Sequence, residues 1–302
     1  MRNKRTVCIL ILSVCLIAAA LLFYQCYQSS QQAKRQLEKK KVAWNILREK
    51  ISKEIKTSRA KMGVVIKDLD IGWQIFYRQD EVIPAASLVK IPIMAACYLA
   101  AEEKRIGLKD KLMLTAANKV SGSGELKNRP CGSIFSIEEL IGFMICQSDN
   151  TACNMLIDFL GFAYLNDSFK RMGLRNTNLS RRMMDFSGRG MGIENYTTSR
   201  DMAYLLEKIY HQEFLNKQVS QRCLNLLKHQ KVNNRIGRKL PASVVVAHKT
   251  GSERNICHDA GIVFTDKGDY LICVLTNKAK ASKEAKQLIA NLAFYTYSYY
   301  FQ

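Results

Sequence analysis

Three short motifs carry the residue types needed to transfer an acyl group. They are Ser87-Leu-Val-Lys90, Ser148-Asp149-Asn150 and Lys249-Thr250-Gly251. A serine hydroxyl is a weak nucleophile until a base takes its proton, and a buried lysine with a depressed pKa can be that base. A spacing of three puts both side chains on one face of a helix. The first motif could therefore supply a nucleophile, Ser87, with its base, Lys90, although by itself it also fits a capping serine and a surface lysine.

The second motif supplies groups that could relay a proton and hold a substrate. It lies between two helical segments, and an extended link there would aim Ser148 and Asn150 into one space while Asp149 points elsewhere. Ser148 could then pass a proton to a leaving nitrogen, and Asn150 could bind a substrate amide. Ser148 or Asp149 would also cap the helix that follows.

The third motif adds positive charge and a binding edge. We expect it to end a strand that begins near Val244. Lys249 would place its charge beside Ser148, and Thr250 would bind a substrate carboxylate. Gly251 would let the substrate backbone lie along the strand edge. The other S-x-x-K of the chain, Ser58-Arg-Ala-Lys61, has no partners at matching intervals, and we interpret it as chance.

The elements that must position these motifs have a simple order, with strands at both ends and helices between them. Strand patterns cover residues 62–69, 73–78, 243–248, 261–264 and 270–275, and helical patterns cover residues 42–61, 91–103, 137–146, 151–160, 199–210 and 283–299. Residues 181–196 are expected to form a long loop that contains several glycines. The order predicts an α/β (α+β) fold, in which helices flank one antiparallel sheet and an all-helical lobe is inserted. The site is expected where lobe and sheet meet.

The N-terminal segment has the length and composition of a membrane span. Residues 6–33 carry no charge, and residues 6–24 are almost entirely apolar. This run favours a retained anchor, although the alanines at 18–20 leave a cleaved signal peptide as an alternative. Basic residues before the span predict a single-pass protein of the cell membrane with its C-terminal domain outside the cytoplasm, or a secreted domain if the segment is cleaved.

The predicted domains follow from these patterns. Residues 1–27 form the anchor or signal segment, residues 28–41 a polar stalk, and residues 42–302 the hydrolase domain. That domain divides into a sheet lobe, 42–84 and 240–302, and a helical lobe, 85–239. We expect a monomer.

Charge and cysteine content exclude several classes of protein. The net charge of +20 divides equally between residues 1–60 and the rest, so the basic N-terminal part could touch anionic lipid headgroups. A domain outside the cytoplasm without a recognition motif is not expected to bind nucleic acid. The ten cysteines are scattered and lack the spacing of a disulfide framework or a zinc site. We expect buried thiols, no metal and no cofactor.

Taken together, the three motifs resemble those of class A β-lactamases and penicillin-binding proteins, in order and in spacing. The resemblance covers residues 42–302 and implies the β-lactamase-like fold. It implies that Ser87 is acylated with Lys90 as a base, and that Ser148 passes the proton onward with support from Lys249. The implied substrate-binding residues are Asn150, Thr250, Gly251 and Ser252, and the backbone N–H groups of Ser87 and Ser252 would form the oxyanion hole.

One position departs from class A β-lactamases, which carry a glutamate on a long loop between the second and third motifs. Here Met183 or Met184 occupies that place, and a thioether cannot act as a general base. Asp185 is shifted along the loop, and Glu194 is farther away. In lacking this glutamate the chain resembles D,D-peptidases. We therefore expect it to form an acyl-enzyme with β-lactams or with the D-Ala-D-Ala end of peptidoglycan stem peptides. The alternatives are a β-lactamase that uses Asp185 or an unassisted water, and a module that is acylated and signals.

Overall fold

The computed structural model describes residues 2–58, 60–278 and 281–301, except for the side chains of residues 2–15, 18 and 19. The chain divides into two compact units, the first ending at Lys50 and the second comprising Ile51–Phe301. The predicted boundaries at residues 27 and 41 remain predictions.

The first unit consists of one helix, α1 (Arg2–Thr57), whose last turns belong to the second unit. The expected stalk of residues 28–41 is helical throughout. Within the part of the chain that the structure describes, no helix combines the length and apolar character needed to cross a membrane. Residues 6–15, 18 and 19 of the predicted anchor lie outside the residues with described side chains.

The second unit is built on one antiparallel sheet in the order β2-β1-β9-β8-β7. Its strands are β1 (Lys61–Asp68), β2 (Gln74–Tyr77), β7 (Val245–Glu253), β8 (Ile256–Phe264) and β9 (Tyr270–Asn277). Val65 of β1 lies opposite Cys273 of β9, so strands from the two ends of the domain are neighbours. Two-stranded pairs join β3 (Ile83–Pro84) to β6 (Tyr196–Thr197) and β4 (Lys111–Met113) to β5 (Ile134–Ser136). The predicted fold class, an antiparallel sheet flanked by helices, is confirmed, but the inserted lobe is not all-helical, because it contains the short strands β4, β5 and β6.

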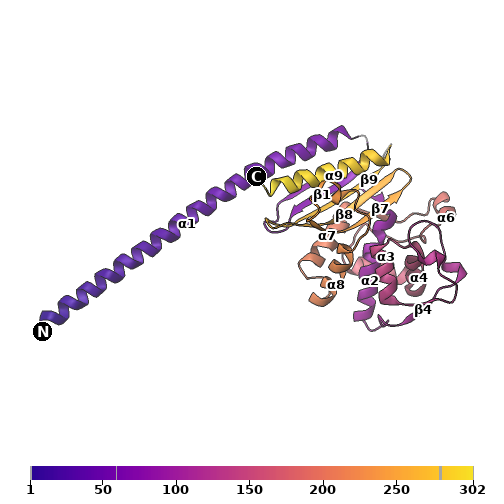
Figure 1. Cartoon of the computed structure of the whole chain (residues 1–302), viewed down its shortest axis with the longest axis horizontal. Helices are drawn as coiled ribbons and strands as arrows, with labels where there is room; N and C mark the ends of the chain where they lie inside the picture. The colour runs from indigo at the N-terminus through magenta and orange to yellow at the C-terminus, as the bar shows by residue number, and fades with distance from the viewer. Residues whose placement is uncertain (1, 59, 279–280, 302) are drawn as a thin grey trace. The chain divides into compact units, whose positions relative to one another are not determined.

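Helices cover both faces of the sheet. The C-terminal helix α9 (Ser282–Tyr299) lies along one face, and α7 (Ser199–Tyr210) lies on the other, where the remaining helices follow (Figure 1). These are α2 (Lys90–Glu102), α3 (Ile137–Cys146), α4 (Asn150–Leu160), α5 (Phe162–Arg171), α6 (Phe186–Gly190) and α8 (Lys217–Lys228).

Helix α2 is the centre of the main hydrophobic core. Its residues Ile91, Ile93, Met94 and Cys97 are fully buried. A helix that is apolar on all sides is enclosed by its neighbours. The packing of α2 therefore holds the first motif, at the start of this helix, in a defined position.

Some predicted elements differ from the structure. The expectation that Lys249-Thr250-Gly251 ends a strand is wrong, because β7 continues to Glu253. Lys249 and Thr250 are polar but buried, and Ser252 and Glu253 continue the strand by pairing with Cys257 and Ile256 of β8. The expected loop at 181–196 contains the short helix α6, and α5 and α8 were not predicted.

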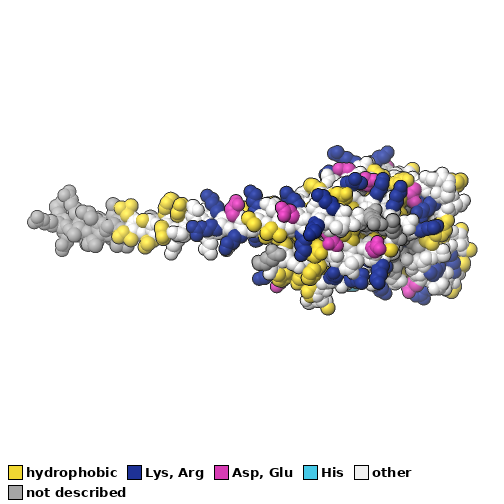
Figure 2. Space-filling view, turned by 90° about the horizontal axis from the view of Figure 1, so that it is seen from above, with side chains coloured by type: hydrophobic (Ala, Val, Ile, Leu, Met, Phe, Trp, Pro, Cys, Tyr) yellow, Lys and Arg dark blue, Asp and Glu magenta, His cyan; other side chains and the backbone are white. Residues whose placement is uncertain are grey.

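Charge and cysteines agree with a globular domain. Basic side chains are spread over the face seen in Figure 2, with acidic side chains among them, as on an ordinary solvated surface. Eight cysteines are free thiols, of which Cys97, Cys153, Cys223, Cys257 and Cys273 are buried, and the side chains of Cys8 and Cys15 lie outside the described residues. Cys26 and Cys131 are exposed, contrary to the general expectation of burial.

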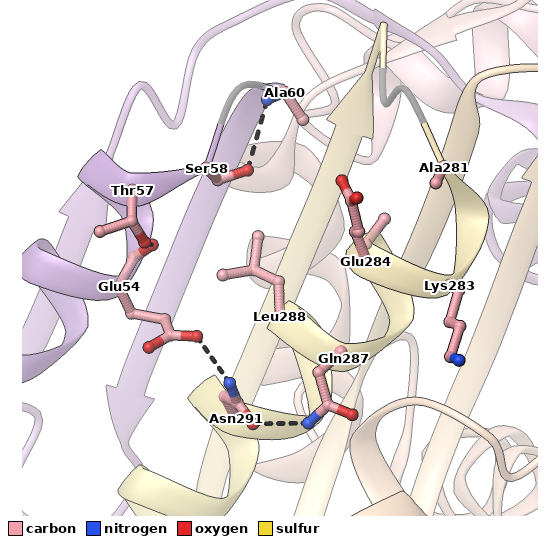
Figure 3. A pocket seen from close by; sticks show the side chains of 11 residues that line it. Glu54, Thr57, Ser58, Ala60, Ala281, Lys283, Glu284, Gln287, Leu288 and Asn291 are labelled. Carbon is pink, nitrogen blue, oxygen red and sulfur yellow. Dashed lines mark hydrogen bonds between the residues drawn. The ribbon is translucent and has the colours of Figure 1, made fainter.

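A cavity of about 520 Å³ lies between the end of α1 and α9 (Figure 3). Asn291 Nδ2 donates to Glu54 Oε1 at 2.6 Å, and Gln287 Nε2 donates to Asn291 Oδ1 at 2.8 Å. The described residues around it include none of the predicted catalytic groups. The chemistry must therefore be sought at the three motifs.

Candidate active site

The predicted nucleophile lies in a 3₁₀ turn, η1 (Ala86–Val89), that runs directly into α2. Lys90 is the first residue of α2, and its Nζ lies 3.3 Å from Ser87 Oγ. The side chain of Lys90 is fully buried. The predicted pairing of Ser87 with Lys90 therefore exists as a direct contact.

Lys90 is surrounded by neutral partners in the described part of the chain. Its Nζ donates to Asn150 Oδ1 at 2.7 Å, to the carbonyl of Ser148 at 2.7 Å and to Ser148 Oγ at 3.2 Å. Burial without a paired carboxylate disfavours the ammonium form, and it lowers the pKa of Lys90 to about 8. A lysine with such a pKa is partly neutral near physiological pH and can accept a proton.

The second motif links α3 to α4. Ser148 has a φ of 56°, so the link is not extended throughout, and the expected alternation fails at this residue. Ser148 Oγ nevertheless lies between two lysines, 3.2 Å from Lys90 Nζ and 2.9 Å from Lys249 Nζ. Asn150 contacts the same Lys90, so both side chains reach one space, as predicted. A left-handed serine carries backbone strain, which is found most often at functional sites.

Asp149 holds the second motif in place. Its side chain accepts the N–H of Ala152 at 2.9 Å and thus caps α4, as the sequence allowed. Its other oxygen accepts the N–H of Leu126 at 2.9 Å. The loop of residues 120–126 is thereby fixed against Ser148 and Asn150.

Lys249 in the third motif is a second buried lysine. Its Nζ donates to Ser148 Oγ at 2.9 Å and to the carbonyl of Thr250 at 3.0 Å. Burial, together with the charges of Lys90 and Arg235, holds the pKa of Lys249 well below its usual value. A β-carbon on Gly251 would lie 3.1 Å from His258 Cδ2 and 3.4 Å from the carbonyl oxygen of Ala85, so β7 packs against the turn that carries Ser87.

Arg235, which is 2% exposed, also belongs to the site and was not predicted. Its guanidinium donates to the carbonyl of His258 at 2.7 Å and to the hydroxyl of Ser252. Its Nε has no hydrogen-bond partner among the described residues. Its contact with the Ser252 hydroxyl places this buried cation beside the third motif. No short motif contains Arg235, so its place in the site could not be seen from spacing.

The loop that lacks the expected glutamate has a defined structure. Asn154 Oδ1 accepts the N–H of Met183 at 2.8 Å, and Asn154 Nδ2 donates to the carbonyl of Met183 at 3.1 Å. Met184 has a φ of 64°. A β-carbon on Gly122 would lie 3.1 Å from Met184 Sδ and 2.7 Å from Asn150 Nδ2, so the thioether lies beside Asn150.

Both carboxylates of this loop, those of Asp185 and Glu194, already contact other residues. Asp185 Oδ1 accepts the N–H of Gly188 at 2.8 Å and caps α6. Glu194 forms a buried ion pair with Arg181 at 2.7 Å. The site therefore brings together the four side chains predicted for acylation, those of Ser87, Lys90, Ser148 and Lys249. The carboxylates of the loop instead form contacts that hold the loop in place. The oxyanion roles of the Ser87 and Ser252 N–H groups stay predictions.

The pKa of Lys90 predicts how acylation depends on pH. Below about pH 8 Lys90 is increasingly protonated and cannot act as a base, so the rate should fall by about tenfold per pH unit. Above that pH the neutral amine prevails and the rate should level off. Lys90 and Lys249 both contact the Ser148 hydroxyl, so their titrations are coupled. The pH at the midpoint of the rate profile therefore reflects both lysines and not Lys90 alone. Acylation rate constants from pH 6 to 10 measure it, and a flat profile through pH 8 would contradict it.

A pair of glycines allows a matched test of the loop that covers the second motif. Gly124 (φ 101°) and Gly132 (φ 90°) both have positive φ, but a β-carbon on Gly124 would lie 2.2 Å from Asp149 Cγ, whereas one on Gly132 meets open space. Gly124→Ala should therefore lower the free energy of unfolding by at least about 1 kcal/mol more than Gly132→Ala. Thermal or denaturant unfolding measures both, and equal losses would refute the close contact.

The comparisons with known proteins agree with this geometry. Residues 46–300 match the profile of a family described as the beta-lactamase enzyme family. Beta-lactamase VEB-1 of Pseudomonas aeruginosa is 23% identical over 270 residues, covering 83% of this chain and 89% of VEB-1. A beta-lactamase of Proteus vulgaris is 27% identical over 251 residues, covering 81% of this chain and 92% of its own.

Two solved structures are similar over most of their length. PBP-A has 30% identity and a TM-score of 0.77, covering 83% of this chain and 94% of PBP-A. The beta-lactamase of Sphaerobacter thermophilus has 29% identity and a TM-score of 0.77, covering 83% and 96%. The chain therefore belongs to the beta-lactamase enzyme family, and it is a serine hydrolase of the class A type.

Proposed function

We propose that β-lactams acylate this enzyme at Ser87 and that the acyl group leaves slowly, as in a D,D-peptidase. The proposal rests on one contrast. The residues needed for acylation contact one another, whereas the two carboxylates of the loop already form contacts elsewhere. Lys90, partly neutral and 3.3 Å from Ser87 Oγ, can take the proton of the nucleophile. Met183 and Met184 offer no base to a water.

The proposed acylation uses the observed contacts in order. Ser87 Oγ attacks the substrate carbonyl while Lys90 accepts its proton. Ser148 Oγ, within hydrogen-bond distance of both lysines, passes a proton to the departing nitrogen. Arg235, and Lys249 when it is protonated, would supply positive charge for a substrate carboxylate. The natural substrate class is then a peptide ending in D-Ala-D-Ala, from which the terminal D-Ala leaves.

A class A β-lactamase is the second candidate, because the named relatives include beta-lactamases. That activity needs a group to activate the deacylating water. The engagement of Asp185 as the cap of α6 argues against it as that group. A mutant of PBP-A was solved as an acyl-enzyme complex with penicillin G, which supports acylation by β-lactams, the step that both candidates share.

The test follows the acyl-enzyme over time. Full-length protein is mixed with penicillin G, and its intact mass is recorded from seconds to hours, with Ser87→Ala as the control. One adduct per chain that persists for many minutes, and none on the control, is the expected result. Continuous turnover of a chromogenic cephalosporin would support the β-lactamase instead, and absence of both adduct and turnover would refute both candidates.

The proposal includes an anchor in the cell membrane with the hydrolase domain outside the cytoplasm. It is supported by the uncharged segment of residues 6–33 and the basic residues before it. The full chain should stay with membranes after an alkaline carbonate wash, whereas a chain starting at residue 28 should not. Release of the full-length chain by the wash would contradict the anchor, and a shortened N-terminus would indicate cleavage.

A further inference from the structure

A long stretch of the domain, residues 214–252, carries many positive charges and no negative charge. It contains eight Lys and Arg and no Asp or Glu. Among the described residues, only one of these eight forms an ion pair, namely Arg222, whose Nη1 lies 3.9 Å from Glu138 Oε1. Even where the buried Lys249 is neutral, seven cations remain. We call residues 214–252 the basic segment, and its unbalanced charge produces a positive potential around it.

The basic segment borders the site between the second and the third motif. The N–H of Lys231 donates to the carbonyl of Cys146 at 3.1 Å, and Cys146 lies two residues before Ser148. Four residues after Lys231, Arg235 donates to the Ser252 hydroxyl. Because consecutive α-carbons are about 3.8 Å apart, the Lys231 nitrogen lies at most about 10 Å from the α-carbon of Ser148. The basic segment and the reacting groups are therefore neighbours.

The side chain of Lys231 can act on a molecule in solution. It is exposed, and it forms no hydrogen bond or ion pair with the described residues. Burial raises the pKa of the Cys146 thiol, and the charges of Lys231 and Lys249 oppose that rise, so both charges act close to the start of the second motif. Interactions between exposed charges extend over about 10 Å at 0.1 M salt. The charge of Lys231 is therefore felt at Ser148.

The carboxylates beside the basic segment leave its charge unbalanced. Asp259 is fully buried and lies 2.8 Å from His248 Nδ1. Glu253, which follows the segment directly, pairs with Arg181 and Arg189 of the loop. In the part of the chain that the structure describes, neither carboxylate forms an ion pair with a lysine or arginine of the basic segment. One buried negative charge thus stands against seven or eight positive ones.

We infer that the basic segment, through Lys231, makes this enzyme prefer acidic substrates, which are peptides or β-lactams with negative charge in addition to their one terminal carboxylate. A cleft bordered by unbalanced positive charge raises the local concentration of anions and speeds their association. The same charges repel a substrate that carries an ammonium group. Lys231 acts on association and takes no part in proton transfer. The inference rests on the proposed acylation of Ser87.

Two lysines on either side of α8 provide matched variants. Lys231→Glu reverses the charge beside the site. Lys217→Glu changes the net charge equally, and its lysine is also exposed, but Lys217 begins α8 far from the site. The preceding Asn216 donates to Glu102 at 2.8 Å, at the end of α2, and Lys90 begins that helix about 18 Å away. Lys231→Gln removes the charge without reversing it.

The experiment uses the full-length chain and three penicillins with the same nucleus. Carbenicillin carries a carboxylate on the α-carbon of its acyl side chain, ampicillin carries an ammonium group there, and penicillin G carries neither. The measured quantity is the ratio of second-order acylation rate constants, carbenicillin over ampicillin. At about 10 mM salt it should fall about fourfold or more in Lys231→Glu, by a smaller factor in Lys231→Gln, and less than about twofold in Lys217→Glu.

Salt provides a second readout that needs no variant. In the unmodified chain the ratio should fall towards the value of Lys231→Glu at about 1 M salt, where charges act over only about 3 Å. Melting temperatures of the variants exclude unfolding as the cause of a change.

Two results would overturn the inference. One is an equal fall of the ratio in Lys231→Glu and Lys217→Glu, which is an effect of net charge alone. The other is a ratio that neither Lys231→Glu nor salt changes. If none of the three penicillins acylates the unmodified chain, the proposed function itself fails. If all three acylate it and the ratio stays constant, only the preference for acidic substrates fails, so the two failures are distinguished.

Discussion

Replacing Lys90 by alanine is expected to slow acylation of Ser87 by about 10²–10⁴-fold, the usual contribution of a positioned general base. Lys90 Nζ lies 3.3 Å from Ser87 Oγ, and burial lowers its pKa to about 8. The neutral amine is the proton acceptor that the nucleophile needs. The rate constant for adduct formation with penicillin G, from intact mass or a competing fluorescent penicillin, measures the effect.

Two control variants distinguish a lysine that acts as the base from one that only supports the structure. Lys90→Arg keeps the positive charge but cannot deprotonate, so it should lose as much activity as Lys90→Ala. Lys61→Ala alters the exposed lysine of the other S-x-x-K sequence and should leave the rate unchanged. Melting temperatures of all three variants exclude unfolding as the cause. A rate for Lys90→Ala within about tenfold of the unmodified chain would contradict its role as the base.

Replacing Met183 by glutamate is expected to accelerate release of the acyl group by about 10²–10⁴-fold, because it supplies the missing general base. The backbone of Met183 is fixed on both sides by Asn154, at 2.8 Å and 3.1 Å, so a new side chain starts from a defined position on the loop. The 5% exposure of Met183 would raise the pKa of a new carboxyl group, which favours proton acceptance near neutral pH. A persistent adduct should thus become steady turnover of a chromogenic cephalosporin.

Met183→Gln is the matched control, since it has the shape of glutamate without a base, and it should keep the long-lived adduct. Met184→Glu tests the neighbouring position, whose side chain lies against Gly122 and should give the smaller gain. If neither glutamate shortens the life of the adduct while acylation stays normal, slow release has a cause other than the missing carboxylate.

Much of the fold was predictable, because the apolar patterns of strands and helices are local. The helices α3 (Ile137–Cys146) and α7 (Ser199–Tyr210) have the bounds that the sequence indicated. Helix α8 was missed although its buried residues Val219, Cys223 and Leu227 recur at every fourth position, which is a readable signal. The extension of β7 to Glu253 was not readable, because Ser252 and Glu253 are polar and belong to the strand only through their pairing with Cys257 and Ile256 of β8.

The sequence by itself determined which groups attack, relay and bind, since the three motifs carry those residue types in a fixed order, and it determined that the loop has no glutamate at the expected place. Only the tertiary structure decided the state of these groups. It surrounds Lys90 with neutral partners, brings Arg235 to Ser252, and engages Asp185 and Glu194 in contacts of their own. The pKa of a group and the availability of a carboxylate depend on burial and on neighbours distant in the chain, and these exist only once the chain has folded.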